Sequence, residues 1–303
     1  MAYGGKMMKE KVILDCDCSF DIPGCDVDDG LTIMYLLGAP TIDLLGVTLS
    51  QGNSDWAGVL GAARRLKDRL HLPFDYYFAP DTGEQPQMAA SDFLVQTVNA
   101  HPHEITLLGT GGLTNIKRAL ASDSLFLNKV KRIVLMGGNC FPLVINGHPV
   151  GELNFKIDPT AAQLIFASGA SLTIMNGHMT TEALFSRDFS QRLAAELQTT
   201  LPADCYQYFT TAIDEWMDLQ ERDLDLPGFC NWDITTAVYL EHPEYFTPER
   251  VYLAADQSAI AEAGRINLVD HSPRMITMPA HIKNLAAFND LVYRRLLAGL
   301  QQD

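Results

Sequence analysis

The sequence predicts an α/β fold with an open, mostly parallel sheet flanked by helices. Short apolar runs alternate with stretches of helical periodicity through the first 175 residues, which is the pattern of repeated β-α-β units. The apolar runs are continuous rather than alternating, as expected for strands that are covered on both faces. The chain of 303 residues contains no linker, internal repeat or low-complexity tract, so we expect a single domain over residues 1–303.

The first half carries the βαβ rhythm. The expected strands cover residues 12–14, 42–49, 74–78, 105–108, 133–136 and 172–175. The expected helices between them cover residues 31–37, 56–70, 93–98, 113–120 and 159–167. In a parallel sheet built this way, ligands bind beyond the carboxyl ends of the strands, where the strand order switches. Functional side chains are therefore expected just after each strand.

The second half changes to a mainly helical pattern. The expected helices cover residues 189–197, 205–219, 234–240 and 281–297, and two further strands are expected at 250–254 and 266–269. Pro279 lies before the start of the last helix, where proline is tolerated. We expect this half to complete the same domain.

An acidic segment at residues 15–29 follows the first expected strand and leads into a helix. It holds six aspartates: Asp15, Asp17, Asp21, Asp26, Asp28 and Asp29. So many like charges at one strand end repel each other unless a cation or bound protons compensate, and hard divalent cations prefer carboxylate oxygens. The alternative is an exposed acidic loop in which Asp26 or Asp28 caps the helix. The position after a buried strand favours a cation site.

Three later segments also follow strands or begin helices. Residues 109–116 form a glycine-rich turn with Thr114 or Asn115 as a helix cap. Glu152 and Asn154 have alternate-residue spacing, so an extended backbone would point both the same way, as suits binding to neighbouring hydroxyls. Asp233 is interpreted in its simplest form as a helix cap.

Taken together and in order, these segments resemble the nucleoside hydrolases. The matching stretches are ILDCD and DVDD in residues 13–29, QGN at 51–53, GTGGLTNI at 109–116, VLMGG at 134–138, GELNFKIDP at 151–159 and WD at 232–233. The resemblance spans residues 14–240. It implies an open α/β fold and Ca²⁺-dependent hydrolysis of the N-glycosidic bond of a ribonucleoside, giving free base and ribose.

The resemblance also implies a role for each matching residue. Asp17, Asp29, the carbonyl of Thr110 and Asp233 match the family's Ca²⁺ ligands, and Asp28 matches the general base that takes a proton from the attacking water. Asp15 matches a supporting carboxylate. Ribose contacts are implied for Asn53, Met136, Glu152 and Asn154, with Asn146 as a contact of the 5′-hydroxyl. Such a site stabilises the positive charge that builds on the ribosyl ring as the bond breaks.

The chain departs from the family pattern at three places. The acidic segment contains additional residues at 20–27, and Asp21 or Asp26 from this stretch could replace an expected ligand. Trp232 stands where many members carry a histidine, which resembles the purine-preferring branch and implies stacking on a purine or modified purine. The region that carries a base-flanking histidine loop in many members has no clear match, residues 81–87 being the nearest candidate.

Composition limits the partners and the compartment. Lys and Arg number 22 against 37 Asp and Glu, which gives a net charge of −15 and disfavours nucleic acid and anionic membranes as partners. No apolar stretch is long enough to span a bilayer, and Met1–Lys11 lacks a signal-peptide pattern, so we expect a cytoplasmic protein. The six cysteines form no CxxC pair and are expected to be free thiols. The resemblance further implies a homo-oligomer, a dimer or tetramer.

Two other functions remain open from sequence alone. Asp15-Cys-Asp17-Cys-Ser19 after an apolar strand also fits the nucleophile motif of haloacid dehalogenase-type phosphatases, although this reading leaves residues 109–116 and 151–155 without a role. A catalytically inactive nucleoside-binding protein is the second alternative, because the acidic segment is altered.

Overall fold

The computed structural model describes residues 8–82 and 84–301, and its centre is a large sheet. Within these residues nine strands form the sheet in the order β12-β11-β13-β8-β5-β4-β1-β2-β3. Their bounds are β1 Glu10–Cys16, β2 Ile42–Leu49, β3 Tyr76–Tyr77, β4 Ile105–Gly109, β5 Arg132–Met136, β8 Leu172–Met175, β11 Arg250–Leu253, β12 Leu268–Val269 and β13 Met275–Thr277. The pairings from β3 across to β13 are parallel, and only β11 runs antiparallel to its neighbours. The predicted mostly parallel α/β sheet is confirmed.

The strand order switches direction at β1. From β1 the chain adds β2 and β3 on one side and then returns to add β4, β5 and β8 on the other. The helices that follow β1 and β4 therefore leave the sheet on opposite sides, and a crevice opens at the carboxyl ends of these two strands. The segments after β1 and β4 are the acidic segment and the glycine-rich turn of residues 109–116.

The core lies on both faces of the sheet because successive strand side chains point in opposite directions. In β1, Val12 and Leu14 pack into one hydrophobic cluster, whereas Ile13 between them packs into the other. All three side chains are fully buried. The continuous apolar run that predicted this strand thus reflects a sheet covered on both sides.

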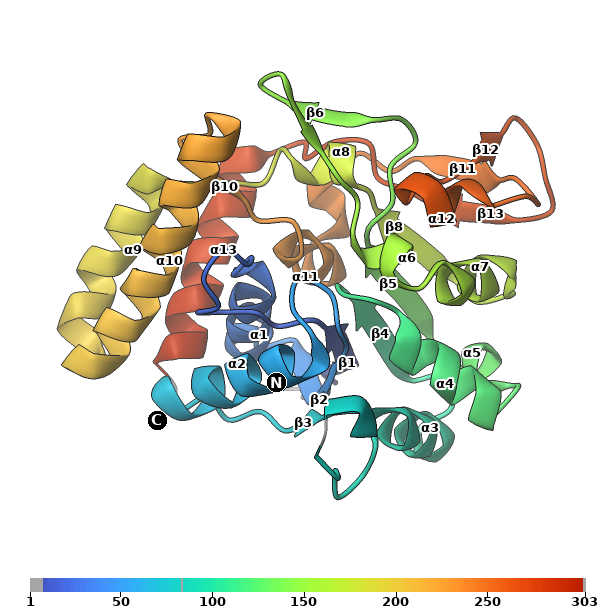
Figure 1. Ribbon diagram of the computed structural model, residues 1–303, viewed down its shortest axis with the longest axis horizontal. Coiled ribbons are helices and arrows are strands. Elements are labelled where there is room, and N and C mark those ends of the chain that lie inside the picture. The colour runs from blue at the N-terminus through green and yellow to red at the C-terminus, as the bar shows by residue number, and fades with distance from the viewer. Residues whose placement is uncertain (1–7, 83, 302–303) are drawn as a thin grey trace, which may run out of the picture.

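Helices cover both faces of the sheet, as Figure 1 shows. The first cluster takes side chains from α1 (Asp28–Gly38), α2 (Trp56–Arg69), α9 (Arg187–Thr200), α10 (Ala203–Leu224), α11 (Ile234–Glu241) and α13 (Leu285–Leu300). The second takes them from α3 (Ala90–Ala100), α4 (Thr114–Ser122), α5 (Phe126–Lys129), α7 (Pro159–Ala167) and α12 (Ala259–Ala263). None of the helices in the described residues is long and apolar enough to cross a membrane.

Short elements connect the larger helices and strands. They are α6 (Asn154–Ile157), α8 (Gly177–Thr180), the 3₁₀ turns Pro80–Thr82 and Pro243–Tyr245, the hairpin of β6 (Leu143–Ile145) with β7 (His148–Val150), and the pair β9 (Leu184–Ser186) with β10 (Gly228–Cys230). In Figure 1 the hairpin projects from the main body on the same side as α8.

Several predicted elements differ from the observed ones. Residues 152–154 are not extended, because Leu153 already has helical dihedral angles and α6 begins at Asn154. The strand predicted at 74–78 is confined to β3, and the last helix begins at Leu285 because the Asn284 side chain accepts a hydrogen bond from Ala287 N at 3.1 Å. The β6–β7 hairpin was not predicted, although Asn146-Gly147 has the left-handed dihedral angles that a tight hairpin turn requires.

Candidate functional site

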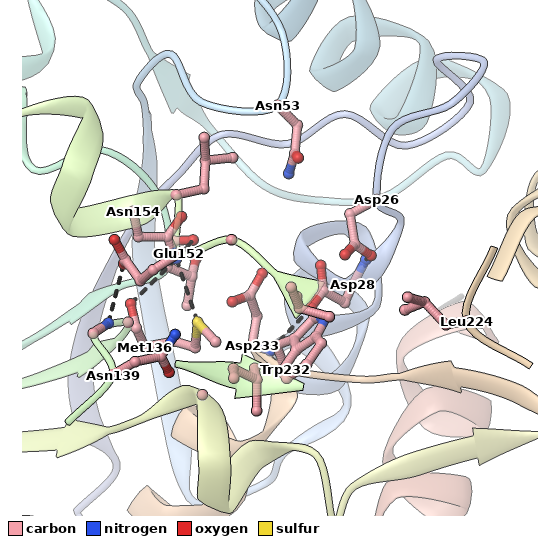
Figure 2. Close-up of a pocket in the computed structure, with 18 of the residues that line it drawn as sticks. Asp26, Asp28, Asn53, Met136, Asn139, Glu152, Asn154, Leu224, Trp232 and Asp233 are labelled. Carbon is pink, nitrogen blue, oxygen red and sulfur yellow. Dashed lines mark hydrogen bonds between the residues drawn. The ribbon is translucent and has the colours of Figure 1, made fainter. Parts of the chain in front are cut away.

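A cavity of about 350 Å³ lies at the switch point, beyond the carboxyl ends of β1, β4 and β5. Eight of the twelve residues predicted to form a site line this cavity. Those eight are Asp28, Asn53, Thr110, Met136, Glu152, Asn154, Trp232 and Asp233. Figure 2 shows that Asp28 and Trp232 lie on one side of this space and Met136, Glu152 and Asn154 on the other, with Asp233 between them.

The end of β1 supplies the two deepest carboxylates. Asp15 accepts hydrogen bonds at one oxygen from Thr48 Oγ1 at 2.7 Å and Asn115 Nδ2 at 2.8 Å, while its other oxygen is buried without a partner. Asp17 accepts a hydrogen bond from Asn53 N at 2.6 Å. Asp15 thus lies behind the cavity wall and is fixed by its neighbouring strands and helix.

The first turn of α1 supplies two more carboxylates. Asp29 accepts hydrogen bonds from Asp17 N at 3.1 Å and from Thr110 Oγ1 at 2.6 Å, which joins the ends of β1, α1 and β4. Asp28 accepts one from Asp233 N at 3.1 Å, which joins α1 to the start of α11. The N-terminus of α1 carries a partial positive charge that favours both carboxylates there.

These carboxylates are an unusual concentration of buried negative charge. Asp15, Asp17, Asp28, Asp29 and Asp233 are each 4% exposed or less, and none forms an ion pair with a Lys, Arg or His within the described residues. Burial raises the pKa of Asp15 and of Asp17 to about 7. Burial, reinforced by the neighbouring negative charges, raises the pKa of Asp29 and Asp233 well above the usual range. The cluster needs a counter-charge to be fully ionised at neutral pH.

The donor chemistry fits a hard divalent cation. Carboxylate and carbonyl oxygens converge on the cavity, and burial raises the pKa of the nearby Cys16 and Cys18 thiols, which leaves them neutral and poor ligands. As they stand, no three His, Cys, Asp or Glu side chains in residues 8–82 and 84–301 form a group that could hold a metal ion. Instead, Asp233 shares side-chain hydrogen bonds with Asp28 and with Asp29. The assignment of a hard divalent cation to this site therefore rests on the chemical type and the burial of the oxygen donor atoms.

The additional residues 20–27 divide between the core and the cavity. Phe20 is fully buried against Tyr208 and Phe209 of α10, and Asp21 forms an ion pair with Arg65 of α2 at 2.5 Å. Asp21 is therefore directed away from the cavity. Asp26 lines the cavity and shares a side-chain hydrogen bond with Asp28, so this stretch adds one carboxylate to the site.

The wall opposite Asp28 is formed by the ends of β5 and by residues 151–154. Asn154 Nδ2 donates to the carbonyl of Thr110 at 2.8 Å and to that of Met136 at 3.2 Å. Glu152 accepts hydrogen bonds from the backbone N–H groups of Gly138 at 3.0 Å and Phe155 at 2.8 Å. Although residues 152–154 are not extended as predicted, both side chains still line the cavity.

Asn146, expected to contact a 5′-hydroxyl, does not line the cavity. It lies in the turn between β6 and β7, and its Nδ2 donates to the carbonyls of Leu224 at 3.0 Å and Asp225 at 3.1 Å. The Asn146 amide therefore fastens the hairpin to the C-terminal end of α10. In residues 81–87, the nearest candidate for a base-flanking loop, residues 81 and 84–87 do not line the cavity, and Asp81 pairs with Arg118. Residue 83 lies outside the described residues.

One face of α10 forms a cavity wall that the sequence reasoning missed. Trp216, Gln220 and Leu224 recur every four residues and therefore project from the same side of the helix. The indole N–H of Trp216 is buried without a hydrogen-bond partner, and no described hydrogen bond engages the side chain of Gln220. The helical spacing was available in the sequence, but it did not show which face would meet the cavity. None of the described lining residues is a histidine.

Comparison with known proteins adds an independent line of information. A family model described as inosine-uridine preferring nucleoside hydrolase matches residues 12–289. A protein of Oryza sativa subsp. japonica, described as probable uridine nucleosidase 2, is 30% identical over 284 residues, which cover 84% of this chain and 80% of that protein. The pyrimidine-specific ribonucleoside hydrolase RihB of Escherichia coli (strain K12 / DH10B) is 28% identical over 277 residues, 82% of this chain and 84% of that protein.

Solved structures share the fold at lower sequence identity. A purine-preferring ribonucleoside hydrolase from Gardnerella vaginalis superposes with a TM-score of 0.80 and 22% identity, covering 96% of this chain and 99% of that one. A plant nucleoside hydrolase superposes with a TM-score of 0.78 and 22% identity, covering 95% and 99%. These similarities show that the architecture is shared.

Proposed function

Because the chain belongs to the inosine-uridine preferring nucleoside hydrolase family, we propose that it uses this cavity to cleave ribonucleosides into free base and ribose in a Ca²⁺-dependent reaction. The observation that carries the proposal is the set of buried, uncompensated carboxylates at the switch point. A cationic ribosyl transition state and a bound cation are both stabilised by such a negatively charged site. Family membership disfavours the phosphatase and the inactive binding protein.

We assign the cation to Asp17, Asp29, Asp233 and the carbonyl of Thr110. The first three carry buried carboxylates with raised pKa values, and Thr110 is linked to Asp29 through its hydroxyl. When bound, Ca²⁺ supplies positive charge that anchors the vicinal hydroxyls of ribose and acidifies a water molecule. One Asp15 oxygen is buried without a hydrogen-bond partner, and it adds negative charge behind the proposed cation position.

Asp28 is the proposed general base. Its carboxylate accepts a hydrogen bond from the N–H of Asp233 and lines the cavity next to the other acidic side chains. In the proposed reaction water adds its oxygen to C1′ and passes a proton to Asp28 while the C1′–N bond breaks. The base leaves with the bonding electron pair and takes up a proton from solvent.

The opposite wall is proposed to hold the sugar. Asn154 is fixed by two backbone carbonyls and Glu152 by backbone N–H groups, so neither side chain must be ordered when ribose binds. Asn53 and Met136 complete the proposed sugar contacts from the two sides of the cavity. Prior fixation of these groups lowers the entropic cost of orienting the substrate.

Two indole rings support a stacked purine as the leaving base. Trp232 and Trp216 both line the cavity, and Figure 2 shows Trp232 on the side away from Glu152. Large aromatic faces stack best on fused-ring bases. The relatives described as uridine or pyrimidine nucleosidases support uracil as the second candidate. Gln220, with a free amide on the same wall, offers a donor and an acceptor to either base.

A panel of nucleosides tests the proposal. Inosine, adenosine, guanosine, uridine, cytidine and a base-modified purine nucleoside would be incubated with the protein, with and without a chelator, and reducing sugar measured. We expect ribose release in calcium, fastest from a purine nucleoside, and loss of release in the chelator. Absence of release from every nucleoside would refute the function, while hydrolysis of p-nitrophenyl phosphate with Mg²⁺ would restore the phosphatase alternative.

We further propose that the protein acts in the cytoplasm as a homo-oligomer on a free nucleoside. The net charge of −15 supports a small neutral substrate over nucleic acid or an anionic membrane. The dimer or tetramer is an expectation from the family. Sedimentation velocity of the purified protein would measure it.

A further inference from the structure

Asp26 is a carboxyl group in the cavity to which neither the cation nor the sugar gives a role. It belongs to the additional stretch 20–27 and lines the same cavity as Asp28. Its Oδ1 atom accepts hydrogen bonds from the backbone N–H groups of Val27 at 2.8 Å and Asp28 at 3.3 Å. Because Oδ1 is used in this way, Oδ2 is the oxygen atom of Asp26 that can carry a proton.

The neighbouring carboxyl groups of Asp26 and Asp28 differ in their affinity for a proton. Burial raises the pKa of both residues. The charge of Asp28 and a hydrogen bond shared by the two side chains raise the pKa of Asp26 further, whereas the same hydrogen bond lowers that of Asp28. Two carboxylates in contact do not both ionise easily, so the pair favours a state with one proton. That proton belongs on Asp26 and leaves Asp28 charged, as a general base requires.

The departing base needs a proton that no histidine on the described cavity wall can supply. A base that leaves with the bonding electron pair carries negative charge unless it is protonated as the bond breaks. The N–H groups of Trp232 and Gln220 line the cavity but are too weakly acidic to give up a proton. Figure 2 shows Asp26 on the same side of the cavity as Trp232 and Leu224, which is the side proposed for the base.

The other carboxyl groups on the cavity wall are engaged in different interactions. Asp223 is 51% exposed and pairs with Arg222 at 2.8 Å, and this hydrogen bond lowers the pKa of Asp223. Glu152 lies on the sugar side of the cavity and accepts three backbone N–H groups. Asp233 is assigned to the cation. Asp26 is therefore the carboxyl group best placed to transfer a proton on the base side.

We propose that Asp26 is the general acid that protonates the departing base, an inference that rests on the proposed function. As the C1′–N bond breaks, its electron pair moves onto the base, which takes the proton from Oδ2 of Asp26. Water adds its oxygen to C1′ and passes a proton to Asp28. Solvent then returns a proton to Asp26, and Asp28 releases its proton, so both groups regain their starting states. The proton that the base takes up thus comes from solvent through Asp26.

The test compares substrates whose leaving groups differ in their need for a proton. The unmodified nucleoside that the wild-type protein cleaves fastest would be compared with two activated ribosides, p-nitrophenyl β-D-ribofuranoside and 7-methylguanosine. p-Nitrophenolate leaves as a stable anion, and the positively charged 7-methylguanine ring becomes neutral when it leaves, so neither needs an acid. Asp26→Asn keeps an acceptor for the N–H of Val27 but has no acidic proton. We expect kcat/KM to fall about 100- to 10,000-fold for the nucleoside and to change little for the activated ribosides.

Two further variants separate proton donation from a structural role. Asp21→Asn changes an aspartate of the same stretch that pairs with Arg65 away from the cavity, and it should keep the wild-type ratio of nucleoside to activated riboside. Asp28→Asn removes the proposed base and should slow all the substrates alike, because each of them needs the attacking water. Each ratio is measured on one protein preparation, so a smaller folded fraction does not change it.

The outcomes distinguish this inference from the proposed function. Equal losses on all substrates in Asp26→Asn, or an unchanged rate with the nucleoside, overturn the role of Asp26 while ribose release by the wild-type protein still supports the hydrolase. If Asp26→Asn proves unfolded by circular dichroism, the same comparison on Asp26→Ser decides, because serine keeps an oxygen acceptor near the start of α1. A wild-type protein that releases ribose from no nucleoside overturns the function and this inference with it.

Discussion

At the scale of single residues, the same burial that positions the acidic side chains also makes their ionisation costly. Burial raises the pKa of Asp28, while its hydrogen bond from Asp233 N favours the charged form. A base must be ionised to accept a proton, so its neighbours decide whether it works at neutral pH. A cation held by Asp29 and Asp233 would favour that ionised state.

Replacing Asp28 by Asn removes the proposed proton acceptor and keeps the shape of the side chain. We expect kcat to fall by about 100- to 10,000-fold, the usual contribution of a general base, while Ca²⁺ still binds. Steady-state kinetics measures kcat, and isothermal titration calorimetry measures the binding of Ca²⁺. Normal turnover in Asp28→Asn would remove this residue as the base.

Replacing Trp232 by Ala removes the indole from the base side of the cavity. Stacking of a base on an aromatic ring contributes about 1–3 kcal/mol, and the larger face of a purine gains more. We expect kcat/KM to fall more for inosine than for uridine, each measured by base release. Equal losses on the two substrates would argue that Trp232 only shapes the cavity.

Some of the predicted site residues lie together, although their roles stay predictions. Asp28 and Thr110 line the cavity, and Asp29 accepts a hydrogen bond from Thr110. The α10 face of Trp216, Gln220 and Leu224 was not predicted, because its place on the cavity wall depends on which distant segments meet it. Asn146 lies six residues before Glu152, as the resemblance implies, but the turn between β6 and β7 places its side chain against α10.

At the scale of elements, the additional stretch 20–27 is anchored in the core at one end and lines the cavity at the other. Phe20 fits closely over Gly30, where a Cβ atom would lie 2.5 Å from its ring, and it packs on α10. Ser19 Oγ donates to the carbonyl of Asp26 at 3.0 Å, which closes the stretch into a compact loop. The anchor thereby places Asp26 beside Asp28.

Removing this anchor should destabilise the protein. Phe20→Ala empties a fully buried position, for which we expect a loss of about 3–5 kcal/mol in the free energy of unfolding. Phe141→Ala is the matched control, because Phe141 is 60% exposed and its removal should cost little. Urea unfolding of both variants measures the difference. Comparable stabilities would mean that Phe20 does not anchor the loop.

Element-level prediction was most accurate for the parallel strands and weakest at the cavity rim. Continuous apolar runs identify strands such as β1 and β4, because a strand that is buried on both faces carries apolar residues at successive positions. Short rim elements such as β6 and α6 are only three and four residues long, so periodicity does not reveal them. Their form depends on turn residues and on contacts with α10.

At the scale of the whole molecule, Glu241 ties three distant helices together. At the end of α11 it accepts hydrogen bonds from Arg295 of α13 at 2.8 Å and from Tyr35 of α1 at 2.9 Å. Burial alone would raise the pKa of Glu241, but the hydrogen bonds from Arg295, Thr41 and Tyr35 outweigh it and lower the pKa. The charged carboxylate therefore stabilises the folded state above the unfolded pKa, and this contribution disappears as pH falls through the lower folded pKa.

Glu241→Gln should reveal this contribution. We expect a loss of about 1–3 kcal/mol at pH 7, and a shrinking difference from the wild-type protein as pH falls below about 4. Thermal unfolding across pH measures it, and a single transition is expected for one domain. Glu244→Gln, at an exposed pair with His242, is the control and should change little. A difference independent of pH would contradict the role of the charge.

The most direct measurement of the central claim is a titration of metal-free protein with Ca²⁺, followed at once by ribose release and thermal stability. The buried carboxylates predict one tight site, a higher melting temperature on binding, and activity that reaches its maximum at one equivalent of Ca²⁺. In Asp29→Asn both responses should be lost together. Full activity in metal-free protein, or calcium binding that changes neither stability nor ribose release, would contradict the account.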